Sequence, residues 1–184
     1  MSRQGQLLIA HPNLPLDHPF GQTVIYVGYD GDDGVTGLIL NKSTNLSVND
    51  FLHRRKLDTL NTGDNNMHIG GPVNTQSVFM LHSNDWESTT SIDAGNGLSI
   101  SSDDFMLEKL ALGHVPAYWR LFAGVCSWQA GQLDLELKGT APYRPENSWL
   151  TCKPNDNIIY NYDGVDQWEK SMTLSREQLI NSYI

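Results

Sequence analysis

The chain has 184 residues, with 12 Lys plus Arg against 21 Asp plus Glu, and a formal net charge of −9 at pH 7. That length suits one domain of about 100 to 200 residues with its own core, so we expect a single domain over residues 1–184. The negative charge repels phosphate backbones and anionic lipid, and we therefore expect no direct nucleic-acid partner and no membrane contact.

The N-terminal segment and the cysteines predict a cytoplasmic location. The segment MSRQGQLLIAHPNLPLDHPF has only a short apolar run before His11, which does not fit a signal peptide. No stretch approaches the roughly 18 consecutive apolar residues of a membrane span. Cys126 and Cys152 show neither a disulfide-scaffold spacing nor a CxxC spacing, so we expect a reduced, cytoplasmic protein.

The first half of the chain predicts strands separated by turn residues, with one helix. Asp and Gly at residues 30–34 (DGDDG) supply a hairpin loop, and Gly95-Asn96-Gly97 supplies another. Ser47, followed by Asp50 three residues later, predicts a capped helix that ends near residue 57. Strands are predicted at residues 7–11, 23–29, 35–41 and 78–82, and a hairpin-like unit at residues 91–101.

The second half mixes helices with strands. Ser102 or Asp103 is expected to cap a helix that ends before Gly113 and has Phe105, Met106, Leu110 and Leu112 on its apolar face. Strands are predicted at residues 118–125, 149–153 and 157–161, and helical segments at 165–172 and, behind a Ser175 cap, 176–184. The pattern predicts an α+β domain with a mixed, largely antiparallel, strongly curved sheet and several flanking helices.

The segment GVCSWQAGQLDLEL, residues 124–137, is the most distinctive stretch of the sequence. We predict a strand that ends near Val125, a turn through Cys126 and Ser127, and a helix from Trp128 with Leu133 and Leu137 facing the core. The segment matches neither a P-loop, nor a GxGxxG fingerprint, nor a nucleophile elbow. Cys126 is interpreted as a small buried hydrophobe, with redox sensing as the alternative.

Metal and cofactor motifs are missing from the sequence. The six histidines, at positions 11, 18, 53, 68, 82 and 114, show no HExxH, HxH or mixed Cys/His spacing, so we expect no metal and no cofactor. The carboxylate pairs, such as Asp32-Asp33, are interpreted as solvated turns or caps.

The order of several motifs resembles one family. LLIAHPNL, PFGQTVIY, GLILNK, IGGPV, FMLHS, GVCSWQAGQLDLEL, WLTCK and IIYNYDGVDQWEKSM occur in the order expected for the AlgH/YqgE-like family. The resemblance implies one α+β domain with a bifurcated, barrel-like sheet, a bacterial cytoplasmic protein, and for one branch a role as a transcriptional regulator. His11, Cys126, Ser127 and Gln129 depart from the family pattern.

The resemblance and the strand ends together predict a candidate cleft for a small ligand or a protein partner. Its predicted residues are Asn41, Lys42, Gly70, Gly71, Pro72, His82, Gly124, Ser127, Trp128, Gly131 and Gln132. We expect a non-enzymatic regulatory or binding protein that affects transcription indirectly, through another protein. The alternative is an enzyme on a small anionic metabolite, with His82 as acid/base and Lys42 as cationic clamp. No catalytic residue is assigned.

Overall fold

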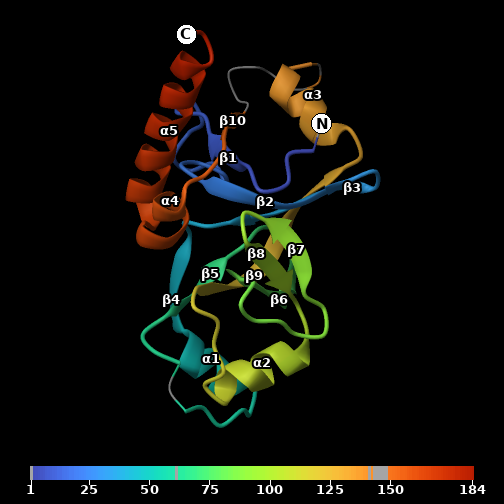
Figure 1. The fold of residues 1–184 in the computed structure, drawn as a ribbon, viewed down its shortest axis with the longest axis vertical. Helices are drawn as coiled ribbons and strands as arrows, with labels where there is room; N and C mark the ends of the chain where they lie inside the picture. The colour runs from blue at the N-terminus through green and yellow to red at the C-terminus, as the bar shows by residue number, and fades with distance from the viewer. Residues whose placement is uncertain (1, 61, 141, 143–148) are drawn as a thin grey trace. The chain divides into compact units, whose positions relative to one another are not determined.

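The computed structural model describes residues 2–60, 62–140, 142 and 149–184 (Figure 1). Contacts group the chain into two compact units. Unit 1 comprises Met1–Lys42 and Ser127–Ile184, and unit 2 comprises Ser43–Cys126. The prediction that residues 1–184 form one domain stays a prediction.

Unit 1 contains an antiparallel sheet. Its strands are β1 (Leu7–Ala10), β2 (Val24–Gly31), β3 (Gly34–Ile39) and β10 (Trp149–Cys152), in the order β10-β1-β2-β3, and the end of β9 (Trp119–Gln129) follows β3. The strands predicted at residues 7–11, 23–29, 35–41 and 149–153 are confirmed. Gly31 pairs with Gly34 across the predicted hairpin loop. A Cβ on Gly34 would lie 2.4 Å from the carbonyl oxygen of Trp128, so only glycine lets β3 approach β9 this closely.

The helices of unit 1 differ from prediction at the C-terminal end. They are α3 (Gln132–Lys138), α4 (Asp156–Asn161) and α5 (Gly164–Asn181). The strand predicted at residues 157–161 is wrong, because the Asn155 side chain caps a helix by accepting a hydrogen bond from the Ile158 amide at 2.9 Å. The two predicted C-terminal helical segments form one helix, since the Ser175 hydroxyl donates to the Thr151 carbonyl instead of capping.

Helix α5 runs beside β1 and β10 (Figure 1). The indole of Trp168 donates to the carbonyl of Ala10 at 2.8 Å, and the buried Gln167 amide donates to the carbonyl of Ile158 at 2.8 Å. These bonds satisfy the polar groups of Trp168 and Gln167, which the apolar face of the helix brings into the core. A buried polar group without a hydrogen bond would cost about 1 to 3 kcal/mol of stability.

Unit 2 contains the other part of the sheet. Its strands are β4 (Ser43–Ser47), β5 (Asn66–Ile69), β6 (Val73–Ser83), β7 (Ile92–Gly95), β8 (Leu98–Ser101) and most of β9, in the order β4-β5-β9-β6-β8-β7. β5 and β9 are parallel, and the other printed pairs are antiparallel. The predicted mixed, largely antiparallel α+β class is confirmed. The sheet that the resemblance describes as barrel-like is not closed into a barrel, because β10 and β7 end an open strand order within the described residues.

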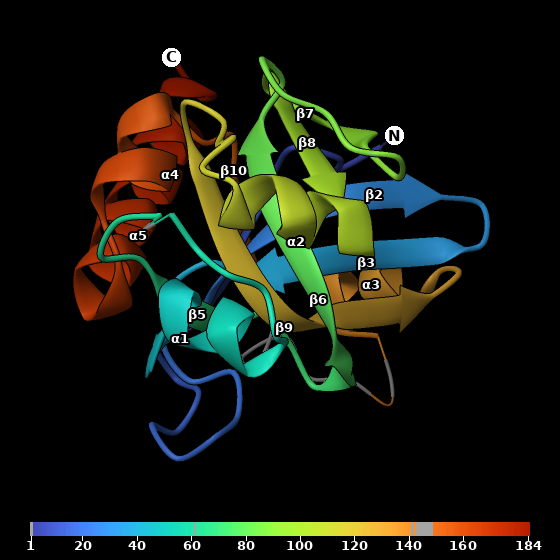
Figure 2. The ribbon, with the colours of Figure 1, turned by 90° about the horizontal axis from the view of Figure 1, so that it is seen from below.

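Helices α1 (Val48–Arg54) and α2 (Asp104–Ala111) cover one side of the unit 2 strands (Figure 2). Both predicted caps are confirmed, since Ser47 accepts from the Asp50 amide and Asp103 accepts from the Met106 amide. Met106 and Leu110 are buried as expected, but Phe105 and Leu112 are exposed. Leu112 follows the last residue of α2, and Phe105 lies against the Lys109 ammonium instead of the core.

Candidate functional site

The segment at residues 124–137 is a strand for longer than predicted. Burial alternates through Cys126, Ser127, Trp128 and Gln129, which is the two-residue period of a strand, and β9 therefore ends at Gln129. The predicted turn at Cys126-Ser127 and helix start at Trp128 are wrong. The turn is Ala130-Gly131, where Gly131 adopts φ 77, and α3 begins at Gln132. Leu133 is buried and Leu137 is half-buried, so the helix does face the core.

Trp128 belongs to a polar cluster inside unit 1. One oxygen of the Glu136 carboxylate accepts from the indoles of both Trp128 and Trp149 at 3.1 Å. The other oxygen accepts from the Gln132 amide at 3.0 Å. Trp128 and Gln132 therefore do not share a helical face, because Trp128 lies on β9, but both donate to Glu136. Because the carboxylate holds all three donors, the cluster joins β9, α3 and β10.

Asn41 and Lys42 have structural partners in unit 1. The buried Asn41 side chain accepts from the Val24 amide and donates to the carbonyls of Gln22 and Gly164, each at 2.8 Å. The Lys42 ammonium donates to the carbonyl of Gly21 at 3.1 Å. Asn41 therefore fastens the end of β3 to β2 and to the start of α5.

The predicted glycines of unit 2 permit close backbone contact. A Cβ on Gly71 would lie 2.1 Å from the carbonyl carbon of Val125, and a Cβ on Gly124 would lie 2.4 Å from the carbonyl oxygen of Gly71. Gly70 is buried, and its amide donates to the carbonyl of Ala123 at 2.8 Å. These contacts make the IGGPV loop, residues 69–73, a tight junction in which Gly70 and Gly71 are buried, whereas Ile69, Pro72 and Val73 are exposed.

Cys126 lies at the same junction. Its thiol is buried and faces the carbonyl of Gly70 at 3.6 Å. Burial raises the pKa of Cys126 to about 12, so the thiolate is scarce near neutral pH. This supports the interpretation of Cys126 as a buried hydrophobe and opposes the redox alternative.

His82 is fully buried in unit 2. Its Nδ1 lies 2.9 Å from the carbonyl oxygen of Ser83, and its Nε2 lies 2.9 Å from the hydroxyl of Ser101. The edge of the Trp86 ring meets the imidazole at 4.9 Å between centroids. Burial lowers the pKa of His82, and the charge of Lys109 lowers it further, against smaller raising effects from the Ser83 bond and Asp85.

The predicted site residues are divided between the two units. Asn41, Lys42, Ser127, Trp128, Gly131 and Gln132 belong to unit 1, whereas Gly70, Gly71, Pro72, His82 and Gly124 belong to unit 2. Within unit 1 the structure brings Trp128 and Gln132 together, and within unit 2 it brings Gly71 and Gly124 together. A single cleft built from the whole set stays a prediction.

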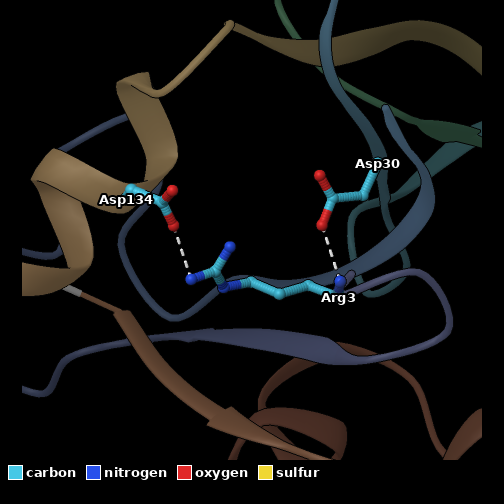
Figure 3. A network of polar contacts seen from close by, with 3 residues as sticks. All are labelled: Arg3, Asp30 and Asp134. Atoms are coloured by element: carbon cyan, nitrogen blue, oxygen red, sulfur yellow. Dashed lines mark hydrogen bonds and ion pairs between the residues drawn. The ribbon is translucent and has the colours of Figure 1, made fainter. Parts of the chain in front are cut away.

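Unit 1 also contains a polar cavity that the sequence did not predict. Its volume is about 240 Å³. The Arg3 amide donates to the Asp30 carboxylate at 2.6 Å, and the Arg3 guanidinium pairs with Asp134 (Figure 3). The residues lining it are Arg3, Asp30, Gly31, Asp32, Gly34, Val35, Ala130, Gly131, Leu133 and Asp134. The only sequence signal was the concentration of carboxylates at residues 30–33, which hairpin chemistry already explained.

The part of the chain that the structure describes shows neither a metal-binding cluster nor a membrane-spanning helix. There, no group of three or more His, Cys, Asp or Glu side chains is arranged to hold a metal ion. No helix within the same residues combines the length and hydropathy needed to cross a membrane.

Fold and site together define an α+β protein with an open mixed sheet and an acidic cavity in unit 1. A family model described as AlgH-like matches residues 7–179, and the chain belongs to this family. The family resemblance predicted from the sequence motifs is confirmed.

Relatives and solved structures agree with this assignment. A UPF0301 protein of Rhizobium meliloti (strain 1021) is 30% identical over 178 residues, covering 92% of this chain and 85% of the relative. A UPF0301 protein of Methylococcus capsulatus (strain Bath) is 30% identical over 169 residues, covering 91% and 88%.

Two solved structures share the fold. The solution structure of the AlgH protein from Pseudomonas aeruginosa has a TM-score of 0.75 at 27% identity, covering 93% of this chain and 87% of that one. A crystal structure of a Corynebacterium diphtheriae protein has a TM-score of 0.68 at 21% identity, covering 91% and 84%, and it supports the fold alone.

Proposed function

We propose that the protein is a regulatory binding protein whose unit 1 cavity receives a basic group of a partner protein. The observation that carries the proposal is the charge of the cavity lining, in which Asp30, Asp32 and Asp134 face a single cation, Arg3. Carboxylates accept hydrogen bonds from Arg and Lys side chains in strong, charge-assisted geometry. The chain's formal charge of −9 attracts basic partners from a distance as well.

The position of Arg3 supports the same occupant. Its guanidinium is paired with Asp134, and both side chains are partly exposed, at 26% and 47%. A partner guanidinium can therefore compete for Asp134 at the surface. A small anionic ligand, the other occupant expected from the sequence, would meet three carboxylates here and be repelled.

The test is a titration of the isotope-labelled protein with the tripeptide Gly-Arg-Gly, followed by amide chemical shifts. We expect shifts concentrated at residues 30–35 and 130–134, and none with Gly-Glu-Gly. Asp134→Asn should weaken binding about ten-fold or more, because a hydrogen bond to a charged group contributes about 1.5 to 3 kcal/mol. Arg3→Ala should strengthen binding, because it removes the internal competitor.

Asp166→Asn is the matched control, since it makes the same charge change at an exposed position of α5. If Asp134→Asn and Asp166→Asn weaken binding equally, the effect is long-range charge alone and the proposed cavity is wrong. Shifts scattered over both units would contradict it too.

The enzyme alternative receives less support from the surroundings of its residues. The Lys42 ammonium, which is the cationic clamp of that alternative, is already bonded to the carbonyl of Gly21. A joint role for Lys42 and His82 on an anionic metabolite stays a prediction.

A further inference from the structure

Three hydrogen-bonding side chains in unit 2 lead from its buried part to its surface. His82 Nε2 and Ser101 Oγ are 2.9 Å apart, and Ser101 Oγ and Ser91 Oγ are 2.6 Å apart. His82 and Ser101 are fully buried, whereas Ser91 is half-buried. Of these three hydrogen-bonded side chains, Ser91 is therefore the most exposed to solvent.

The direction of the hydrogen bonds follows from the partner of His82 Nδ1. That partner is the carbonyl oxygen of Ser83, which only accepts, so Nδ1 carries the proton of the neutral ring. Nε2 is then an acceptor, and the single hydroxyl proton of Ser101 points to it. Ser91 must donate to Ser101 in turn. The protons are thus aligned from Ser91 through Ser101 to His82.

The surroundings keep the imidazole neutral near pH 7. Burial is the largest cause of the lowered pKa of His82. The charged groups that act on it are Asp85 in the loop after β6 and Lys109 on α2, and their effects oppose one another. In the pairing of β6 with β9, the residue opposite His82 is Trp119, which carries no charge. A neutral imidazole that accepts a hydrogen bond at Nε2 can serve as a base toward that donor.

The loop before β7 holds the Ser91 hydroxyl in place. The Ser88 amide donates to Ser91 Oγ at 2.7 Å, which stabilises negative charge on that oxygen. Asp103 fixes the loop, because its carboxylate accepts from the Ser88 hydroxyl at 2.6 Å and from the Thr90 hydroxyl at 2.7 Å. The arrangement comprises a nucleophile, a base and a group that orients the base.

We propose that Ser91 is a nucleophilic acyl acceptor, with Ser101 as proton relay and His82 as base. Ser91 Oγ forms a bond to the acyl carbon of an activated ester or thioester, while its proton passes to Ser101 and the proton of Ser101 passes to His82 Nε2. The bond from the acyl carbon to the leaving oxygen or sulfur breaks, and the leaving group takes that electron pair. Ser101 then donates its proton to the leaving group and is reprotonated by His82, which leaves O-acyl-Ser91 and a neutral ring. This site is independent of the unit 1 cavity.

The probe that tests the proposal is p-nitrophenyl acetate, with acetylated residues identified by peptide mass mapping. Ser91 should be acetylated about a hundred-fold faster than Ser77, an exposed serine of the same unit, because general-base assistance contributes about 10² to 10⁴. Ser91→Ala should abolish the fast phase, and Ser77→Ala should leave it unchanged. Acetylation confined to lysines, or equal rates at Ser91 and Ser77, would overturn the proposal.

The pH profile separates a proton relay from a merely structural network. Protonated His82 cannot accept, so the rate should rise with pH through a midpoint below the ordinary histidine value of 6.5 and then level off. Ser101→Ala, checked for folding by thermal melting, should lose both the fast phase and this midpoint, and Ser101→Thr should restore them. His53→Gln, at an exposed histidine, should leave the profile unchanged. An unaltered profile in Ser101→Ala would also overturn the proposal.

Discussion

Glu136 links the segment at residues 124–137 to strand β10 of unit 1. Its carboxylate accepts from the indoles of Trp128 and Trp149 and from the Gln132 amide. The sequence pattern pointed to Trp128 and Gln132 as site residues but not to Glu136. A carboxylate on a short helix looks solvated from the sequence, and only the position of β10 shows that a second indole reaches it.

Glu136→Gln tests this interpretation. Gln keeps the size of the side chain but replaces one acceptor oxygen with an amide group that donates. Depending on which way the new amide points, either the two indole N–H groups or the Gln132 amide lose their acceptor, and we expect the free energy of unfolding to fall by about 1 to 3 kcal/mol. Urea unfolding followed by tryptophan fluorescence measures it. Glu177→Gln on the exposed face of α5 is the control and should change stability by less than about 0.5 kcal/mol. Equal effects of the two substitutions would show that Glu136 is not structurally important.

At the scale of elements, glycines decide how closely β9 approaches its neighbours. Gly124 and Gly131 have nearly the same backbone conformation, with φ of 73 and 77. Their surroundings differ, since a Cβ on Gly124 would meet the carbonyl oxygen of Gly71 at 2.4 Å, whereas a Cβ on Gly131 would meet nothing within 4 Å. Alanine substitutions at these two glycines therefore separate the cost of backbone strain from the cost of a steric clash.

We expect Gly131→Ala to cost about 1 to 2 kcal/mol, the cost of a left-handed conformation for an L-residue. Gly124→Ala should cost clearly more, because it adds a backbone clash that no side-chain rotation relieves. Denaturant unfolding of the two variants gives the comparison. Equal losses of stability would show that the β9 junction tolerates a methyl group.

Local sequence signals predicted some elements well and others poorly. The caps at Ser47 and Asp103 and the hairpins around residues 30–34 and 95–97 involve only neighbours in sequence, and they are confirmed. The segment NIIYN was predicted as a strand because it is short and β-branched. The Asn155 cap and the Gln167 bond to Ile158 instead hold it as a helix, and the latter depends on α5.

At the scale of the whole molecule, the net charge of −9 predicts how the protein meets nucleic acid. The one basic cluster, at residues 53–56, is exposed near the end of α1. The positive charge of this cluster is small compared with the 21 Asp and Glu residues of the chain. The proposed regulatory role is therefore expected to act through a protein partner.

Fluorescence anisotropy with a labelled DNA duplex tests that expectation. At a salt concentration of about 0.15 M we expect a Kd weaker than about 10⁻⁴ M, the weak limit of ordinary non-specific binding. A Kd below about 10⁻⁶ M would contradict it and would point to residues 53–56 as a direct contact. Arg54→Ala would then identify the cluster.

The sequence by itself determined the α+β class, the family and most element positions, because periodicity, caps and turns act between residues close in the chain. Only the tertiary structure decided what the polar residues do. The Arg3 amide meets a carboxylate 27 residues away, His82 meets a hydroxyl 19 residues away, and Trp168 meets a carbonyl 158 residues away. Such partners are chosen by how strands and helices pack, and no local pattern records that choice.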